Sequence, residues 1–326
     1  MRARFPGFLA RRGGYESFYV KAVAPDRSRA LWIRYTVHQR PHEPPRGSMW
    51  FTWFDAAAEA PLASKVTVDG PPLAEDDRIH IGDGVFGAGV VSGAAPSDRL
   101  DVSWQLGYEA AGEPLWHLPR DWMYTASLPK TKLLSPAPDA RLSGTLRLGD
   151  RSVELDQWAA MVGHNWGSQH AERWIWLQGA LFEGHGHDTW LDVALGRLKI
   201  GPWTTPWIAN GALSLDGRRH RIGGIAKART TEVVETPQGC ELTLPVAGGT
   251  VRGRVSARRQ DLVGWVYADP DGSEHDTVNC SIADLAIEVE LDGSPPLSLR
   301  APGSATYELG MREKDHGIRI QPFPDR

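Results

Sequence analysis

One short stretch in the middle of the chain holds the densest group of side chains suited to chemistry. His164, Asn165 and Trp166 stand in a row between two glycines, and imidazole transfers protons near neutral pH. Trp174 and Trp176 follow at the spacing that places both on one face of a strand. An imidazole beside several indoles is typical of a pocket for a large apolar ligand. A Trp-rich core strand with one hydrogen-bonded histidine would show the same pattern.

The elements that must position these residues are predicted to be strands. The chain has 326 residues with 14 Trp, 35 Gly and 24 Pro, a composition that favours short strands and tight turns over helices. Apolar and polar residues alternate in the first half, most clearly over Ser17–Val23, Ala30–Gln39, Ser48–Asp55, Leu100–Leu106 and Leu142–Leu148.

The strand pattern begins again after Gly167, with Trp174–Phe182, Thr189–Leu195 and Trp207–Leu215 as its first segments. This length exceeds the usual limit of one core, so we expect two all-β domains of antiparallel strands, residues 1–168 and 169–326. Residues 112–139 break the alternation with five prolines. That stretch is predicted to be an irregular connection lying across a barrel mouth or a domain junction.

Charge and cysteine content exclude several classes of protein. The formal net charge is −4, without the basic footprint of a nucleic-acid-binding protein. Cys240 and Cys280 match no metal-ligand spacing and no disulfide framework. The N-terminus lacks a signal-peptide apolar run and no window suggests a transmembrane segment. We therefore expect a cytoplasmic protein; its oligomeric state is left open.

Two motifs are weaker than they look. Residues 82–87 match G-x-G-x-x-G, but the glycines, valines and proline that follow do not favour the helix a dinucleotide site needs. His185 and His187 are spaced for a metal-binding pair on a strand. Glycines around them indicate a solvated hairpin tip instead, and no third ligand is evident. We expect neither a metal nor a cofactor.

The segment from Leu155 to Trp176, with Gly-His-Asn-Trp-Gly at 163–167 and Trp-Ile-Trp at 174–176, resembles the domain junction of the carotenoid 1,2-hydratase (hydroxyneurosporene synthase) family. Tocopherol cyclases, AttH-like proteins and Diels–Alderases are its relatives. The resemblance implies two lipocalin-like (calycin) antiparallel β-barrels packed against each other, with a ligand site between them.

The resemblance also implies acid catalysis without redox chemistry or metal. A protonated group delivers H⁺ to an isoprenoid C=C bond, and water captures the carbocation. The family's histidine and tryptophan fall on His164 and Trp166, and its aromatic-x-Asp pair falls on Trp190 and Asp192. An Asp in an apolar pocket has a raised pKa and acts as an acid near neutral pH. Indole faces stabilise a passing cation.

The chain departs from the family pattern at two positions. Gly163 stands where members carry Asp, and Trp190 replaces a tyrosine. Asp156 is a possible substitute for the missing carboxylate, although a surface position is the simpler interpretation. Glu172, Tyr19 and His38 are further polar candidates, expected to be structural.

Two hypotheses follow. In the first, a cofactor-independent enzyme hydrates, cyclises or isomerises an unsaturated hydrophobic substrate (an isoprenoid, polyene or polyketide), with His164 and Asp192 as the catalytic residues. The second is a lipocalin-type carrier in which the same residues line a cavity. It would be favoured if Asp192 faced solvent or paired with an arginine such as Arg173. In both, the expected ligand contacts are Asn165 and the indoles of Trp50, Trp53, Trp166, Trp174, Trp176 and Trp190.

Overall fold

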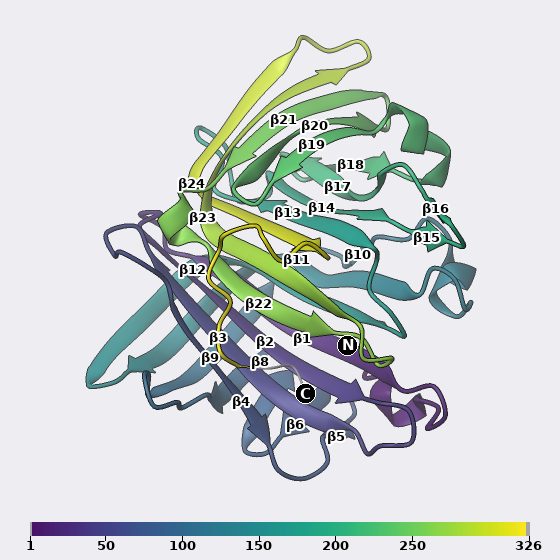
Figure 1. Ribbon diagram of the computed structural model, residues 1–326. Coiled ribbons are helices and arrows are strands. Elements are labelled where there is room, and N and C mark those ends of the chain that lie inside the picture. The colour runs from purple at the N-terminus through teal and green to yellow at the C-terminus, as the bar shows by residue number, and fades with distance from the viewer. Residues whose placement is uncertain (1, 324–326) are drawn as a thin grey trace.

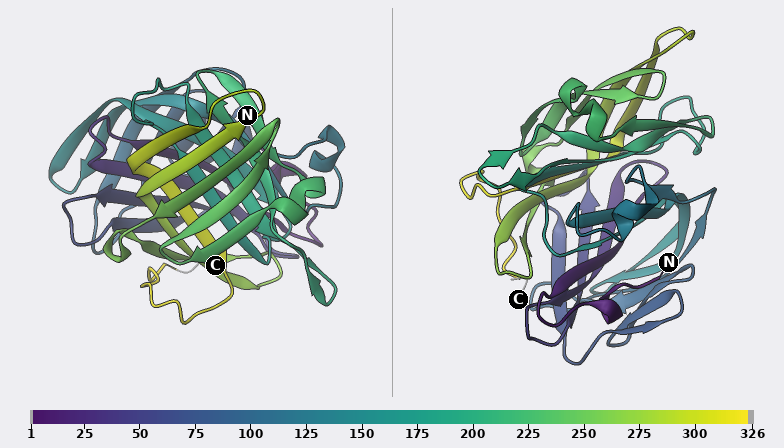
Figure 2. Two further views of the ribbon diagram at one scale, coloured as in Figure 1. Left: turned by 90° about the horizontal axis from the view of Figure 1, so that it is seen from above. Right: turned by 90° about the vertical axis from the view of Figure 1, so that its right-hand side faces the viewer.

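The computed structural model describes residues 2–323 and is built almost entirely from β-strands (Figure 1). Strands up to Gly167 form one antiparallel sheet, and those from Arg173 onward form another, apart from a separate two-stranded hairpin. Figure 2 shows the two units stacked, with strands of one lying over strands of the other. The prediction of an all-β protein of two packed barrels is confirmed.

The N-terminal sheet has the strand order β4-β3-β2-β1-β12-β11-β9-β8-β7-β6-β5, with β10 paired to β11, and it curls into a half-barrel. Its strands are β1 (Gly14–Val23), β2 (Arg29–Gln39), β3 (Arg46–Asp55), β4 (Leu62–Val68), β5 (Leu73–Glu75), β6 (Arg78–Ile81), β7 (Gly84–Gly87), β8 (Val90–Ala94), β9 (Val102–Ala110), β10 (Leu115–Trp116), β11 (Thr131–Leu148) and β12 (Arg151–Gly167).

The C-terminal sheet closes into a barrel of eight strands through the pair Ile222↔Val246, which joins β18 to β20. The barrel strands are β13 (Arg173–Gly179), β14 (Trp190–Arg197), β17 (Ile208–Leu215), β18 (Arg218–Gly223), β20 (Gly239–Val246), β21 (Gly249–Ser256), β23 (Glu274–Leu291) and β24 (Leu297–Met311). Outside the closed ring lie β19 (Glu232–Thr236), β22 (Val263–Ala268) and the small β15 (Lys199–Ile200) and β16 (Trp203–Thr204) hairpin.

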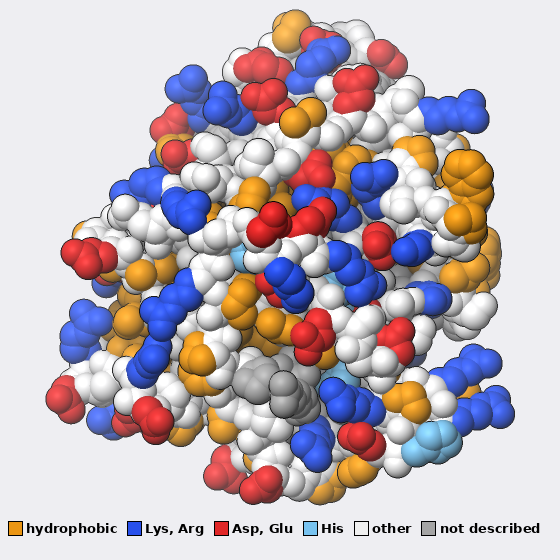
Figure 3. Space-filling model, viewed as in Figure 1, with side chains coloured by type: hydrophobic (Ala, Val, Ile, Leu, Met, Phe, Trp, Pro, Cys, Tyr) orange, Lys and Arg blue, Asp and Glu red, His pale blue; other side chains and the backbone are white. Residues whose placement is uncertain are grey.

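The only helices among residues 2–323 are short 3-10 turns: η1 (Phe5–Gly7), η2 (Asp121–Tyr124), η3 (Ile225–Thr230) and η4 (Arg259–Asp261). None of them could cross a bilayer. On the face shown in Figure 3, acidic and basic side chains are interspersed, without a region of a single charge.

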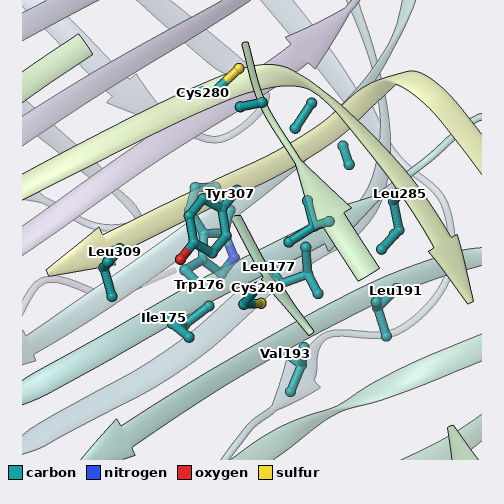
Figure 4. Close-up of a cluster of buried hydrophobic side chains, with 14 of the residues drawn as sticks. Ile175, Trp176, Leu177, Leu191, Val193, Cys240, Cys280, Leu285, Tyr307 and Leu309 are labelled. Atoms are coloured by element: carbon teal, nitrogen blue, oxygen red, sulfur yellow. The ribbon is translucent and has the colours of Figure 1, made fainter. Parts of the chain in front are cut away.

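Alternation along the strands separates two interiors. In β13, Ile175 and Leu177 point into the closed barrel, where they gather with Leu191 and Val193 of β14 (Figure 4). Trp174 and Trp176, one residue out of step, point instead toward the half-barrel. A separate core fills the half-barrel, with Phe18, Phe86 and Trp104 among its buried rings. We use the name joint for the layer where β1–β3, β11 and β12 of the half-barrel face β13, β14 and β22–β24.

The strand predictions hold for the main segments, with one notable difference at the Pro-rich connection. Five prolines suggested an irregular segment over 112–139, but β11 already begins at Thr131 and carries Pro136 and Pro138 as irregularities in its register with β12. The irregular segment is therefore shorter, residues 111–130, called the strap below, and within it the two-residue strand β10 still pairs with β11. The glycine-rich match at 82–87 is a β-turn with β7, as expected, and no helix follows it.

Candidate functional site

The joint is polar as well as aromatic, and one of its groups of hydrogen bonds surrounds Asp192. This side chain is fully buried on β14. Ser135 Oγ of β11 donates to Asp192 Oδ2 at 2.5 Å, and Trp176 Nε1 of β13 donates to Oδ1 at 3.1 Å. His117 Nε2 lies 3.5 Å from Oδ2 and 3.0 Å from Ser135 Oγ. Both barrels and the strap therefore contribute to one buried cluster.

The hydrogen bonds fix how many protons this cluster holds. His117 Nδ1 lies 3.1 Å from the carbonyl oxygen of Asn210, and a carbonyl only accepts, so Nδ1 carries a proton. If Ser135 donates to Asp192, then Nε2 also carries a proton and His117 is an imidazolium beside a carboxylate. If Ser135 donates to His117 instead, Asp192 must carry the proton. The two arrangements contain the same number of protons, and Ser135 connects them.

The balance of these contacts sets the pKa of Asp192. Burial alone raises it, but the positive charge and hydrogen bond of His117, followed by the hydrogen bonds from Ser135 and Trp176, outweigh burial and lower the pKa below its ordinary value. The expectation of a raised pKa is therefore wrong. Its physical reason is that the pocket around Asp192 supplies three donors, whereas the sequence suggested only apolar walls.

The strap brings His117 into the cluster. Arg221 of β18 donates to the carbonyl oxygens of Trp116 and His117, and its neighbour Arg219 donates to the carbonyls of Glu113 and Pro114. These bonds fasten the strap of the N-terminal half to the C-terminal barrel. The predicted position of the Pro-rich segment at a domain junction agrees with this arrangement.

Aromatic side chains cover the cluster from two sides. Trp190 is 4% exposed and packs with Leu115 of the strap. Tyr19 of β1 meets Trp176 edge-on at 5.1 Å between ring centroids. Burial, then the negative charges of Asp192 and Glu308, raise the pKa of Tyr19, so its hydroxyl stays protonated. The sequence offered Tyr19 as a structural residue, whereas the fold places it beside Asp192.

A second buried cluster lies further along the joint and contains Trp174. Glu308 of β24 accepts hydrogen bonds from Trp174 Nε1 at 3.0 Å, and from the Tyr267 hydroxyl and Asn279 Nδ2 at 3.2 Å each. The guanidinium of Arg34 lies 3.9 Å from the centroid of the Tyr267 ring. Trp50 belongs to the same layer.

Trp50 meets Tyr267 and Trp265 edge-on and hydrogen-bonds to Thr36 through its Nε1. Lys65 Nζ lies 3.9 Å from the centroid of the Trp50 ring. The predicted ligand contacts Trp50, Trp174, Trp176 and Trp190 thus all lie in the joint, divided between the two clusters.

His164 lies on the other face of β12. Gly163 pairs with Tyr19 and His164 pairs with Phe18 in the β1–β12 register, and successive side chains point to opposite sides of a sheet. His164 therefore points into the half-barrel, stacked on Phe18 at 4.4 Å. Its Nε2 lies 2.6 Å from Glu16 Oε1. Burial lowers its pKa more than Glu16 raises it. The fold separates His164 from Asp192.

The remaining predicted contacts are distributed over both faces. Trp166 shares the face of His164 and lies under the guanidinium of Arg4, 5.0 Å away. Trp53 packs against Trp158 in the half-barrel core. Asn165 points toward the joint and is partly buried. Asp156, the possible substitute carboxylate, is exposed.

The structure also shows the partners of Arg173, named above for the carrier hypothesis, and of the histidine pair His185 and His187. Arg173 pairs with Glu235 and Glu313 at 2.7 Å each, away from Asp192. His187 contacts Asp139 at 3.1 Å and His185 lies 3.6 Å from Asp216, so the two histidines of the Gly-rich tip have separate carboxylate partners.

Sequence reasoning missed His117 and Ser135. His117 stands in Leu-Trp-His-Leu-Pro within the Pro-rich segment, and Ser135 precedes Pro136. The one available signal was the assignment of this segment to a junction, where a histidine would meet residues of the other domain.

One cavity at the joint is small. Between the Asp192 cluster and the β11–β12 hairpin lies a cavity of about 10 Å³, lined by Trp190, Gln178, Ala159, Pro138 and His187 among others. That is enough for about one water molecule. A larger ligand would fit in this cavity only if the strap or the joint opened.

Comparison with known proteins identifies the fold but gives little about the activity. No family model matches the chain. Two proteins of Mycobacterium tuberculosis, the uncharacterized proteins MT0513 of strain CDC 1551 and Rv0493c of strain H37Rv, are each 24% identical over 312 residues, which span 95% of this chain and 90% of the relative.

Two solved structures share the two-barrel arrangement. An AttH-like protein from Nitrosomonas europaea superposes with a TM-score of 0.57 at 11% identity, covering 95% of this chain and 97% of the other. Kievitone hydratase from Nectria haematococca superposes with a TM-score of 0.50 at 9% identity, covering 95% and 93%. The chain therefore has the fold of these two-lipocalin-domain proteins.

Proposed function

We propose that this protein is a cofactor-independent enzyme that hydrates, cyclises or isomerises an unsaturated hydrophobic substrate through proton transfer at Asp192. The observation that carries the proposal is the position of Ser135 Oγ, 2.5 Å from Asp192 Oδ2 and 3.0 Å from His117 Nε2. Ser135 connects a base and an acid that share one mobile proton. The structural likeness to a hydratase supports this class of reaction.

The proposed reaction begins with the proton on His117. Movement of that proton to Ser135, and of the Ser135 proton to Asp192, leaves a neutral imidazole and a carboxylic acid. Asp192 then protonates one carbon of a C=C bond, whose π electrons form the new C–H bond. The carbocation on the other carbon faces the indoles of Trp176 and Trp190, which stabilise positive charge.

The outcome depends on what meets the cation. Water adds to give an alcohol and returns its extra proton to Asp192, which completes hydration with no net consumption of acid. A second C=C bond gives a ring, and loss of a neighbouring proton gives an isomer. In each case Asp192 accepts the last proton and the pair with His117 is restored.

The strap gives this cluster a way to exclude water. Because His117 belongs to the strap, the proton store is complete only when the strap is docked by Arg219 and Arg221. We propose that the strap lifts to admit substrate and that redocking brings His117 back to Ser135. In this proposal Asp192 is the catalytic residue, and His164, bonded to Glu16, holds β1 and β12 in place.

The alternative is a carrier that binds a hydrophobic molecule without changing it. The burial of Asp192 and its pairing with His117 instead of an arginine favour the enzyme. Any lipophilic molecule that co-purifies would be extracted and identified by mass spectrometry. The extract would then be incubated in H₂¹⁸O or D₂O with wild type, Asp192→Asn and, as a matched control, Asp261→Asn at a buried carboxylate bonded to Arg258.

Hydration would add ¹⁸O, whereas cyclisation or isomerisation would add only deuterium on carbon. We expect wild type and Asp261→Asn to incorporate label and Asp192→Asn to lose at least about 100-fold in rate, as for a general acid. A ligand bound equally by all three proteins and altered by none would establish the carrier.

A further inference from the structure

A group of metal-ligand side chains lies outside the Asp192 cluster, where the linker between the two sheets meets the hairpin of β22 and β23. His170 comes from the linker, Asp269 follows β22, and His275 lies near the start of β23. One ligand atom of each lies within 4.8 Å of the others. Asp269 and His275 flank one hairpin turn, and the fold brings His170 to them from about 100 residues earlier in the chain.

The three side chains are held in place by their surroundings. Asp269 Oδ1 accepts from the His170 backbone N–H and lies 2.7 Å from His170 Nδ1. Its Oδ2 accepts from the Ser273 hydroxyl at 3.2 Å. The His170 ring stacks on Tyr15 at 4.1 Å. Rings held in this way lose little freedom when they bind an ion.

His275 supplies an independent sign of a missing ligand. Its side chain is 0% exposed, and neither ring nitrogen has a hydrogen-bond partner among residues 2–323. Its Nδ1 is 3.9 Å from Asp269 Oδ2, beyond hydrogen-bond distance. A buried imidazole with two unsatisfied nitrogens is costly, unless one of them binds something. The Asp269 carboxylate and the His170 imidazole are close enough to bind the same ligand as His275.

We propose that His170, Asp269 and His275 bind a divalent transition-metal ion such as Zn²⁺. Two imidazoles and one carboxylate form a donor set that suits Zn²⁺ and its neighbours in the series, but not Ca²⁺ or Mg²⁺, which prefer oxygen ligands alone. Three protein ligands leave a further position for water. The His170 side chain is 10% exposed, which gives the ion a path from solvent.

The ion would connect the two halves of the molecule. His170 lies three residues after the last strand of the half-barrel, and Asp269 and His275 belong to the hairpin that packs on β2 and β3. Trp174, which stacks near His170 at 5.2 Å, donates to Glu308 in the joint. Metal binding would therefore hold the linker against the second cluster. The inference is independent of the chemistry proposed for Asp192.

The test is titration of the chelator-treated full chain with Zn²⁺ by calorimetry and with Co²⁺ by visible absorption. His275→Phe keeps an aromatic ring against Trp174 and removes both nitrogens. His170→Phe keeps the stack on Tyr15. The matched control is His187→Ala, at a solvent-exposed histidine that also contacts a carboxylate. Far-ultraviolet circular dichroism and thermal unfolding would establish that each variant is folded.

We expect wild type and His187→Ala to bind one Zn²⁺ per chain, to show Co²⁺ d–d bands and to melt at higher temperature with metal. Each Phe variant should lose at least the roughly 10- to 100-fold in affinity that removal of an outer-sphere partner costs. Absence of binding by wild type, or equal binding by a folded His275→Phe variant, would overturn the proposal. If His275→Phe does not fold, His170→Phe decides by the same criterion.

Discussion

The ring of Tyr19 occupies the space that a side chain at position 163 would need. A Cβ added to Gly163 would lie 2.1 Å from Tyr19 Cζ and 2.4 Å from its hydroxyl oxygen. The family that the sequence resembles carries Asp there. In this chain the Tyr19 ring leaves no room for a side chain at position 163.

This relationship predicts a strong coupling between the two positions. Gly163→Asp alone should destabilise the protein by about 1–3 kcal/mol, because the side chain overlaps a buried ring. Tyr19→Ala alone should also destabilise it by leaving a cavity. The double variant should recover part of the loss. Urea denaturation of all four proteins would measure the coupling; additive losses would contradict the contact.

Trp176 is predicted to lower the pKa of Asp192 through its Nε1 hydrogen bond. Trp176→Phe removes the donor and keeps an aromatic ring, so burial is less well opposed and the folded pKa of Asp192 rises. The stabilisation from a lowered pKa is present above the ordinary value of 3.8 and is lost as pH falls through the folded pKa. The acid-unfolding midpoint of Trp176→Phe should therefore shift to higher pH.

The control for this shift is Trp158→Phe, which changes a buried tryptophan in the half-barrel core, on the face of β12 that points away from the joint. An equal shift in both variants would show that the effect comes from general loss of packing. Carboxyl chemical shifts of Asp192 in the two proteins would measure its pKa directly.

Lys21 should make stability depend on pH in the alkaline range. Its ammonium is fully buried in the joint, bonded to Gln178 Oε1 at 3.0 Å and to the Ser304 carbonyl at 2.8 Å. Burial lowers its pKa from 10.5 to about 7. Between these values the unfolded chain keeps a proton that the folded chain has released, so the free energy of unfolding rises with pH.

Lys21→Met removes this titration. The difference in stability between wild type and Lys21→Met should change by a few kcal/mol in favour of wild type between pH 7 and pH 10. Chemical denaturation at intermediate pH values measures it. A flat difference across this range would mean that Lys21 remains protonated in the folded protein.

Arg221 is predicted to control the strap. Arg221→Ala removes the donors to the carbonyls of Trp116 and His117, so amide exchange over residues 111–130 should accelerate by roughly ten-fold or more, as expected for loss of about 1.4 kcal/mol. Arg218→Ala, at an exposed arginine of the same strand, is the control. Equal protection in the two variants would show that the strap is held by its other contacts, among them the pairing of β10 with β11.

His164 is predicted to matter for stability more than for proton transfer. Its partner Glu16 also accepts from the backbone N–H groups of Arg4 and Phe5. His164→Gln should weaken this attachment of the N-terminal segment and cost about 1–3 kcal/mol. The Asp192 pKa should stay unchanged. A change in that pKa equal to the one caused by Trp176→Phe would return His164 to the catalytic cluster.

The sequence was a good guide to the strands and a poor one to their faces. Alternation over Ala30–Gln39 and Ser48–Asp55 predicts β2 and β3 almost to the residue, because the period of two is local. Both faces of β12 are buried, however, so apolar content does not say which face meets the other barrel. The choice of face determines whether Gly163 or His164 points toward the joint, and the fold places Gly163 there.

The Asp192 cluster depended on contacts that no local pattern contains. The expected pocket joined Asp192 to His164 and several tryptophans. The fold places Trp176 and Trp190 on the side of Asp192, whereas His164, Trp166 and Trp53 lie on the half-barrel side. Ser135 and His117, which also contact Asp192, lie 57 and 75 residues before it in the chain. The same holds for His170, Asp269 and His275, which have no recognisable ligand spacing. Sites assembled across a joint are a tertiary property.

The joint limits how far the two halves can be exchanged. An apolar joint would accept any partner of matching shape, but here Lys21 depends on Gln178 and Ser304, and Asp192 on Ser135 and His117. A chimaera whose other half lacked these partners would leave a buried charge unpaired, at a cost of several kcal/mol. The halves must therefore diverge as a pair, with new specificity arising through matched substitutions on both sides.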